Sequence, residues 1–97
     1  MEEISRGLGW DEFVGGEGRT YTVQAGSAEI EMRLDRAQML SDSGREGGSF
    51  RLEFVGPAAS LIPQGIYRFT DDGGDREIFI VPIAHKPDGA RYEAVFY

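Results

Sequence analysis

Apolar and polar side chains alternate along most of the chain after residue 19. In the clearest segment, 28–35, every second residue is charged. The apolar residues between them are Ala28, Ile30, Met32 and Leu34. A period of two places successive side chains on opposite faces of a strand, so one face packs on a core and the other meets water. The alternation changes phase after Leu34, which predicts a β-bulge near residues 35–36.

Similar segments, separated by residues typical of turns, follow one another to the end of the chain. We expect strands over 19–24, 28–40, 50–55, 66–70, 77–84 and 90–97. Lys86-Pro87-Asp88-Gly89 is typical of a hairpin turn. About six strands with short connections predict an all-β fold, a single antiparallel domain closed as a small barrel or folded as a sandwich. The pattern leaves both open.

The first 17 residues do not follow this pattern and predict a short irregular cap segment, followed by antiparallel strands over 18–97. Glycines interrupt their apolar residues, and Asp11 and Glu12 favour one helical turn that carries Phe13 and Val14 inward. A length of 97 residues fits one domain, 1–97. The inward positions of the strands predict a core of Ile30, Met32, Leu34, Phe50, Leu52, Phe54, Tyr67, Phe69, Phe79, Val81, Tyr92 and Phe96.

The segment 77–84 is apolar on both faces. With Phe79, Val81 and Ile83 assigned to the core, the intervening residues face away from it, and Pro82 indicates an edge position or a bulge. Exposed apolar patches mark interaction sites, and a chain that ends inside a strand offers an edge for strand addition. The alternative is that Leu8, Trp10 and Phe13 cover the patch. The predicted interaction patch consists of Ile78, Ile80, Val95 and Tyr97.

A separate feature, polar in character, is Gln64-Gly65, which precedes Tyr67. A side-chain amide has donors and an acceptor that can tie down loop backbone. We therefore interpret Gln64, Gly65 and Tyr67 as a structural latch for the connection over 57–64. Gly65 would supply a backbone conformation that a side chain hinders.

The composition narrows the classes of function. The chain has 17 acidic and 10 basic residues, a net charge of -7, which disfavours binding to nucleic acid or to anionic membranes. Cysteine is absent, which excludes disulfides, zinc–thiolate sites and cysteine nucleophiles. The N-terminus lacks the pattern of a secretory signal, and no apolar run is long enough to span a bilayer. We expect a cytoplasmic location by default, with export or release in a tail-like assembly as the alternative.

Few residues offer catalytic chemistry. His85 is the single histidine and lies next to a predicted turn, so a triad or a histidine metal site is not expected. The Asp-rich segment 71–75 lacks the ligand spacing of a helix–loop–helix calcium site. The acidic residues of the outward strand faces, Glu53 and Glu93 among them, have arginine neighbours and are better explained as cross-strand charge pairs. We therefore expect no enzymatic activity, no metal and no cofactor.

The second half of the chain resembles a family of small uncharacterised bacterial proteins, a domain of unknown function. The family pattern is F-x-L-x-F-x-G-P, Q-G-x-Y, L-F-L-V-P-V and Y-E-A-V-F, and it corresponds here to segments 50–57, 64–67, 78–83 and 92–96. The chain departs from the family at Tyr97, where Asn is usual, and at Asp71-Asp72, where a His is usual. The resemblance implies no catalytic residue. It implies an association with genes for phage-tail-like or collar-like proteins.

These observations predict a non-catalytic β-domain that mediates protein–protein contact, either with itself as a homo-oligomer or filament, or as an accessory of a phage-tail-like or fibrous assembly. The alternative is a small-molecule or carbohydrate binding module that uses the mouth of the barrel. A third reading is a hydrolase without a recognisable motif. A pocket with convergent polar groups would favour the second reading.

Overall fold

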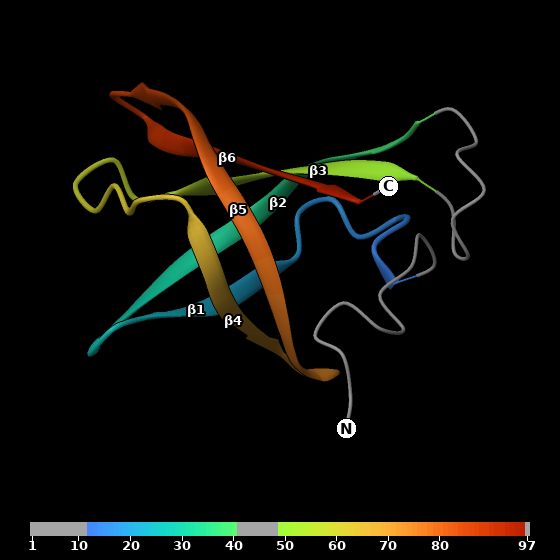
Figure 1. The fold of residues 1–97 in the computed structure, drawn as a ribbon, viewed down its shortest axis with the longest axis horizontal. Helices are drawn as coiled ribbons and strands as arrows, with labels where there is room; N and C mark the ends of the chain where they lie inside the picture. Colours follow the sequence, from blue (N-terminus) through green and yellow to red (C-terminus); the bar gives the residue numbers. More distant parts are fainter. Residues whose placement is uncertain (1–11, 41–48, 97) are drawn as a thin grey trace.

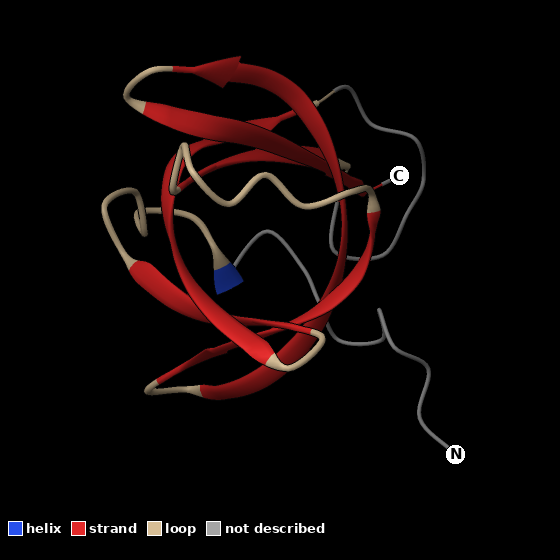
Figure 2. Cartoon of the chain, turned by 90° about the vertical axis from the view of Figure 1, so that its left-hand side faces the viewer, coloured by secondary structure: helices blue, strands red, loops and turns tan. Residues whose placement is uncertain are grey.

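The computed structural model describes residues 12–40 and 49–96, which form a closed antiparallel barrel (Figures 1 and 2). The order of strands around the barrel is β1-β2-β3-β6-β5-β4. The all-β prediction is confirmed, and the barrel is the form adopted. The strands of the described residues are β1 (Thr20–Ala25), β2 (Ala28–Met39), β3 (Phe50–Gly56), β4 (Gly65–Asp71), β5 (Gly74–Lys86) and β6 (Gly89–Phe96).

Two long strands close the barrel because each is shared, end to end, between two neighbours. β2 pairs with β1 through residues 28–33 and with β3 through residues 33–39. β5 pairs with β4 through residues 74–80 and with β6 through residues 81–86. The register shifts between Leu34 and Arg36 and between Pro82 and Ala84, which confirms the predicted bulge in β2 and the bulge indicated by Pro82.

The sequence suggested that the last strand offers a free edge, but in the structure it does not. β6 lies between β3 and β5 in the barrel, and pairs with both. A closed barrel leaves no edge of the kind that recruits an added strand. The prediction of an available edge is therefore wrong, because the backbone of β6 is engaged on both sides within the barrel.

The barrel interior is apolar and rich in aromatic rings. Phe54 contacts Phe69 at a centroid distance of 4.8 Å and Tyr21 at 5.9 Å. Ile30, Tyr67 and Phe96 are half-buried and pack against this core, and Val81 is half-buried. Seven predicted core residues are confirmed as buried: Met32, Leu34, Phe50, Leu52, Phe54, Phe69 and Tyr92.

The phase of β5 is the main error in the predicted core. Phe79 and Val81 are predicted in the core, but Phe79 is 50% exposed and Val81 is half-buried on the same outward face, whereas Ile78 and Ile80 are buried at 1% and 0%. Directly opposed residues of neighbouring strands share a face of the sheet. Tyr67 of β4, which packs against the core, lies opposite Ile78, so Ile78 turns inward and Phe79 outward. The pairing with β4 thus decides which of two apolar faces is buried.

Two irregular segments cover the openings of the barrel. Phe13 is buried and contacts Phe50 and Phe96 at centroid distances of 5.8 and 6.2 Å, which confirms its inward placement, whereas Val14 is exposed against the prediction. Residues 1–11, 41–48 and 97 lie outside the described part, and residues 1–11 include Leu8 and Trp10 of the predicted cap. The connection 57–64 crosses the opposite opening (Figure 2).

Candidate functional site

The residues of the predicted interaction patch do not form one exposed surface. Ile78 and Ile80 lie inside the barrel, because the pairing of β5 with β4 turns them inward. Val95 is exposed on β6. Tyr97 lies outside the described residues. The prediction that Ile78 and Ile80 face solvent is therefore wrong.

An exposed apolar surface nevertheless exists, on the opposite face of the same strand. Ile66 of β4 and Phe79 of β5 lie directly opposite each other and are 54% and 50% exposed. Val81 and Ile83 follow Phe79 at every second position of β5, and Ile83 is also exposed. We call the surface formed by Ile66, Phe79, Val81 and Ile83 the outer apolar face.

The connection over 57–64 is held by residues other than Gln64. Gln64 is exposed, and its side chain makes no hydrogen bond within the described part of the chain. The Tyr67 hydroxyl donates to the carbonyl oxygen of Pro63 over 2.6 Å, and the Tyr92 hydroxyl accepts from the amide of Ile62 over 3.0 Å. Gly65 does not have a positive φ angle. Tyr67 thus ties the connection as predicted, but the roles predicted for Gln64 and Gly65 are not supported.

His85 contributes to the same connection. One of its ring nitrogens, Nε2, lies 2.6 Å from the carbonyl oxygen of Ala58. The side chain is otherwise exposed at the end of β5. This contact joins the end of β5 to the connection 57–64 and gives His85 a structural role.

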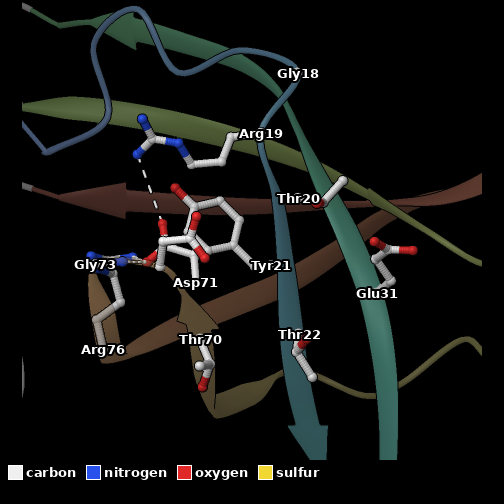
Figure 3. Close-up of a pocket in the computed structure, with 11 residues that line it drawn as sticks. Gly18, Arg19, Thr20, Tyr21, Thr22, Glu31, Thr70, Asp71, Gly73 and Arg76 are labelled. Carbon is white, nitrogen blue, oxygen red and sulfur yellow. Dashed lines mark hydrogen bonds and ion pairs between the residues drawn. The ribbon is translucent and has the colours of Figure 1, made fainter.

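A polar cleft of about 710 Å³ lies on another side of the barrel (Figure 3). Its walls are the start of β1, the outward side of β2 and the turn between β4 and β5. Nearly all of its lining side chains carry polar groups. The lining comprises Gly18, Arg19, Thr20, Tyr21, Thr22, Glu31, Thr70, Asp71, Asp72, Gly73 and Arg76.

Asp71 is the centre of the ionic contacts in the cleft. Its Oδ1 lies 3.2 Å from Nη1 of Arg76 and accepts a hydrogen bond from the amide of Gly73 over 2.9 Å. Its Oδ2 lies 3.8 Å from Nη1 of Arg19. Glu12 reaches Nε of Arg76 from the segment before β1, at 3.4 Å. The carboxylate is thus held from two sides, while the contact with Arg19 is loose.

Tyr21 places a hydroxyl behind these charges. The residue is buried, and neither its hydroxyl nor Nη1 of Arg76 has a well-aligned hydrogen-bond partner among residues 12–40 and 49–96. The Arg76 guanidinium lies 5.7 Å from the centroid of the Tyr21 ring. Burial raises the pKa of the Tyr21 hydroxyl above its ordinary value, although the guanidinium groups of Arg19 and Arg76 act in the opposite direction.

The sequence alone does not mark Arg19, Tyr21 or Arg76 as site residues. Tyr21 follows the period of the core, so its pattern is that of a packing residue. Arg76 lies two residues before Ile78 and therefore on the inward face of β5, which becomes visible only when the pairing with β4 fixes the phase of that strand. A charged residue at an inward position is unusual and indicates a polar site or an ion pair.

A separate charge cluster lies on β3 and β6. Glu53 and Glu93 are directly opposite each other, and both bind Arg51, whose Nη2 lies 2.7 Å from each carboxylate. The bound carboxylates, that of Glu53 first, raise the pKa of the Arg51 guanidinium. The contact between Arg51 and Glu93 is thus a cross-strand charge pair of the kind predicted from the sequence, whereas Arg51 and Glu53 lie on the same strand.

Comparison with known proteins gives a family. A model described as "Domain of unknown function (DUF6916)" matches residues 8–96. The chain belongs to the DUF6916 family. This agrees with the resemblance to an uncharacterised domain family found in the sequence.

The DUF6916 match covers every strand of the barrel and both the outer apolar face and the polar cleft. No curated protein and no solved structure matches the chain. The described residues contain no helix long and apolar enough to cross a membrane. They also contain no group of three or more side chains arranged to hold a metal ion.

Proposed function

We propose that this domain is non-catalytic and makes protein–protein contact through the outer apolar face, with a second copy of the chain as its partner. The observation that carries the proposal is the exposed pair formed by Ile66 and Phe79. An isolated exposed apolar residue is common, but opposed apolar residues that continue along one strand form a patch. Such patches mark interaction sites on soluble domains.

The closed barrel supports contact through side chains. Each strand is flanked by two others, so the backbone of β4 and β5 is engaged within the domain. The outer apolar face stands on a rigid sheet, and little conformational freedom would be lost when a partner covers it. Phe79 supplies the large aromatic side chain that is enriched at interface centres.

A second copy is favoured by the charges beside the patch. Arg68 and Glu77 lie directly opposite each other on β4 and β5. They are the next pair on the same face of the sheet after Ile66 and Phe79. A two-fold contact requires a self-complementary surface, in which a residue of one copy meets a different residue of the other. Because Arg68 and Glu77 lie side by side, the arginine of each copy can pair with the glutamate of the other.

The family resemblance is compatible with this proposal. The resemblance associates the family with genes for phage-tail-like or collar-like proteins, whose products form repeated assemblies. A small domain that pairs with itself would serve in such an assembly as an accessory that joins neighbouring units.

The experiment measures molar mass by light scattering coupled to size-exclusion chromatography over a range of protein concentrations. We expect the wild type to reach twice the chain mass, and Phe79→Asp and Ile66→Asp to remain monomeric with unchanged circular dichroism. Met39→Asp is the matched control, because Met39 is 49% exposed on β2, across the barrel from β5. This control should still associate. A wild type that is monomeric at every concentration would contradict the proposal, as would a Phe79→Asp variant that associates normally.

A further inference from the structure

The polar cleft is separate from the outer apolar face and differs from it in chemistry. It lies over β1, β2 and the turn between β4 and β5, whereas the outer apolar face lies further along β4 and β5 from that turn. Thr20, Thr22 and Glu31 line it from the outward sides of β1 and β2 (Figure 3). Its volume of about 710 Å³ lies within the range of about 300–1,000 Å³ that is usual for small-ligand sites.

The cleft presents donors and acceptors beside one another. Arg19 is half-exposed, with 50% of its side chain accessible, and its 3.8 Å contact with Asp71 is close to the outer limit of an ion pair. Its guanidinium can therefore donate to a ligand without first breaking a strong interaction. Asp71 is held in place by Arg76 and by the Gly73 amide, so its carboxylate is preorganised as an acceptor.

A buried hydroxyl behind the cleft adds a polar group to its wall. The Tyr21 hydroxyl has no well-aligned hydrogen bond with any described residue, whereas Nη1 of Arg76, which also lacks one, is held in an ion pair with Asp71 at 3.2 Å. A buried hydroxyl without a good partner is unfavourable, so a ligand hydroxyl that pairs with it would gain free energy. Figure 3 shows the Tyr21 hydroxyl on the same side as the Arg19 and Asp71 side chains.

The balance of charge selects the class of ligand. Arg19 and Arg76 contribute two positive charges to the lining, and Glu31, Asp71 and Asp72 contribute three negative charges. An anion would be repelled by the carboxylates, and no cluster of metal-ligating side chains is present in the described residues. A hydroxyl group both donates and accepts a hydrogen bond, so adjacent guanidinium and carboxylate groups suit a ligand with neighbouring hydroxyls.

We infer that the polar cleft binds a neutral polyhydroxylated ligand, a saccharide unit, with Arg19 as a donor and Asp71 and the threonine hydroxyls as its other contacts. This inference does not depend on self-association, because the cleft and the outer apolar face share no residue. It gives the domain a ligand site in addition to its proposed contact surface.

The test uses the full chain labelled with ¹⁵N and titrated with glucose, galactose, mannose, N-acetylglucosamine and their disaccharides. We expect at least one of them to shift the backbone amide signals of residues 18–22 and 70–73 in a saturable way. Arg19→Ala should weaken that Kd by about tenfold or more, because a hydrogen bond from a charged group is lost. Arg36→Ala is the matched control, an exposed arginine of β2 that does not line the cleft, and should bind like the wild type.

Inorganic phosphate and glucuronate are titrated in parallel as anionic probes. The inference is overturned if no neutral saccharide shifts these signals at about 100 mM, a concentration that detects even weak binding. It is also overturned if phosphate binds more tightly than the neutral saccharides, or if Arg19→Ala leaves the Kd unchanged. A change in molar mass of the wild type has no bearing on this result, so failure of the self-association proposal remains distinguishable.

Discussion

Single aromatic residues hold the centre of the barrel together. Phe54 is fully buried and contacts the rings of Tyr21 and Phe69. We expect Phe54→Ala to lower the free energy of unfolding by about 3–5 kcal/mol, because apolar transfer energy is lost and a cavity remains. Urea denaturation measures the change. Phe79→Ala, on the exposed face, should cost less than about 1 kcal/mol. An equally small loss for Phe54→Ala would show that Phe54 does not support the core.

Tyr21 differs from the other core aromatics because its buried hydroxyl lacks a well-aligned partner among the described residues. Tyr21→Phe should therefore raise the free energy of unfolding, by about 1 kcal/mol, since the cost of burying that hydroxyl disappears. A loss of similar size in urea denaturation would show instead that the hydroxyl has a stabilising partner.

The same hydroxyl predicts a dependence of stability on alkaline pH. Burial raises the pKa of Tyr21 above its ordinary value of 10.0, despite the nearby Arg19 and Arg76 and with a small contribution from Asp71. Above pH 10 the unfolded chain loses this proton more readily than the folded one, so the free energy of unfolding falls as pH rises through that range. Tyr21→Phe should show a shallower decline between neutral pH and pH above 10. Identical slopes for the two proteins would contradict the shift.

At the scale of elements, β5 is a strand with two apolar faces, of which only one is buried in the core. Phe79 and Ile80 are neighbours of similar character, yet Phe79 faces solvent and Ile80 is buried. We expect Ile80→Asp to prevent folding, because an unpaired carboxylate inside the barrel is strongly unfavourable. Phe79→Asp should fold normally. Circular dichroism and urea denaturation compare the two, and the reverse result would mean that the phase of β5 is the one expected from sequence.

The turn between β4 and β5 uses its acidic residues internally. Asp71 binds Arg76 and the Gly73 amide, and Asp75 accepts a hydrogen bond from the Thr70 hydroxyl over 2.8 Å. We expect no tight calcium binding at residues 71–75, because these carboxylates have partners and lack calcium-site spacing. Isothermal titration calorimetry provides the measurement. A saturable micromolar signal that Asp72→Ala abolishes would contradict this prediction.

At the scale of the whole molecule, net charge opposes the proposed self-association. Each copy carries a net charge of -7, so two copies repel each other at low ionic strength. Contact through the outer apolar face depends mainly on apolar burial, which salt does not screen, whereas the repulsion is screened. The dimer should therefore become tighter as salt rises from about 0.01 to 0.5 M. Sedimentation equilibrium at several salt concentrations tests this, and a dimer that weakens with salt would indicate an interface dominated by ion pairs.

The sequence by itself determined the class of the fold and most of its strands. Period-two alternation is a local property of each strand, and turn residues mark its ends, so both can be recognised without knowing which strands pair. This is why the bulge in β2, the hairpin at 86–89 and most of the core, including Phe54 and Tyr92, were predicted. The barrel was one of the two architectures, barrel and sandwich, that the same pattern allows.

Only the tertiary structure decided which apolar face of β5 is buried and where the polar cleft lies. Ile78 and Phe79 are equally suited to a core, and the choice depends on the residues opposite them in β4, which no local pattern contains. The cleft brings Arg19 and Tyr21 together with Asp71 and Arg76, which are about fifty residues away along the chain. Such a site arises from the pairing of β1 with β4 and from the turn after β4, and pairing of distant strands is a property of the closed barrel.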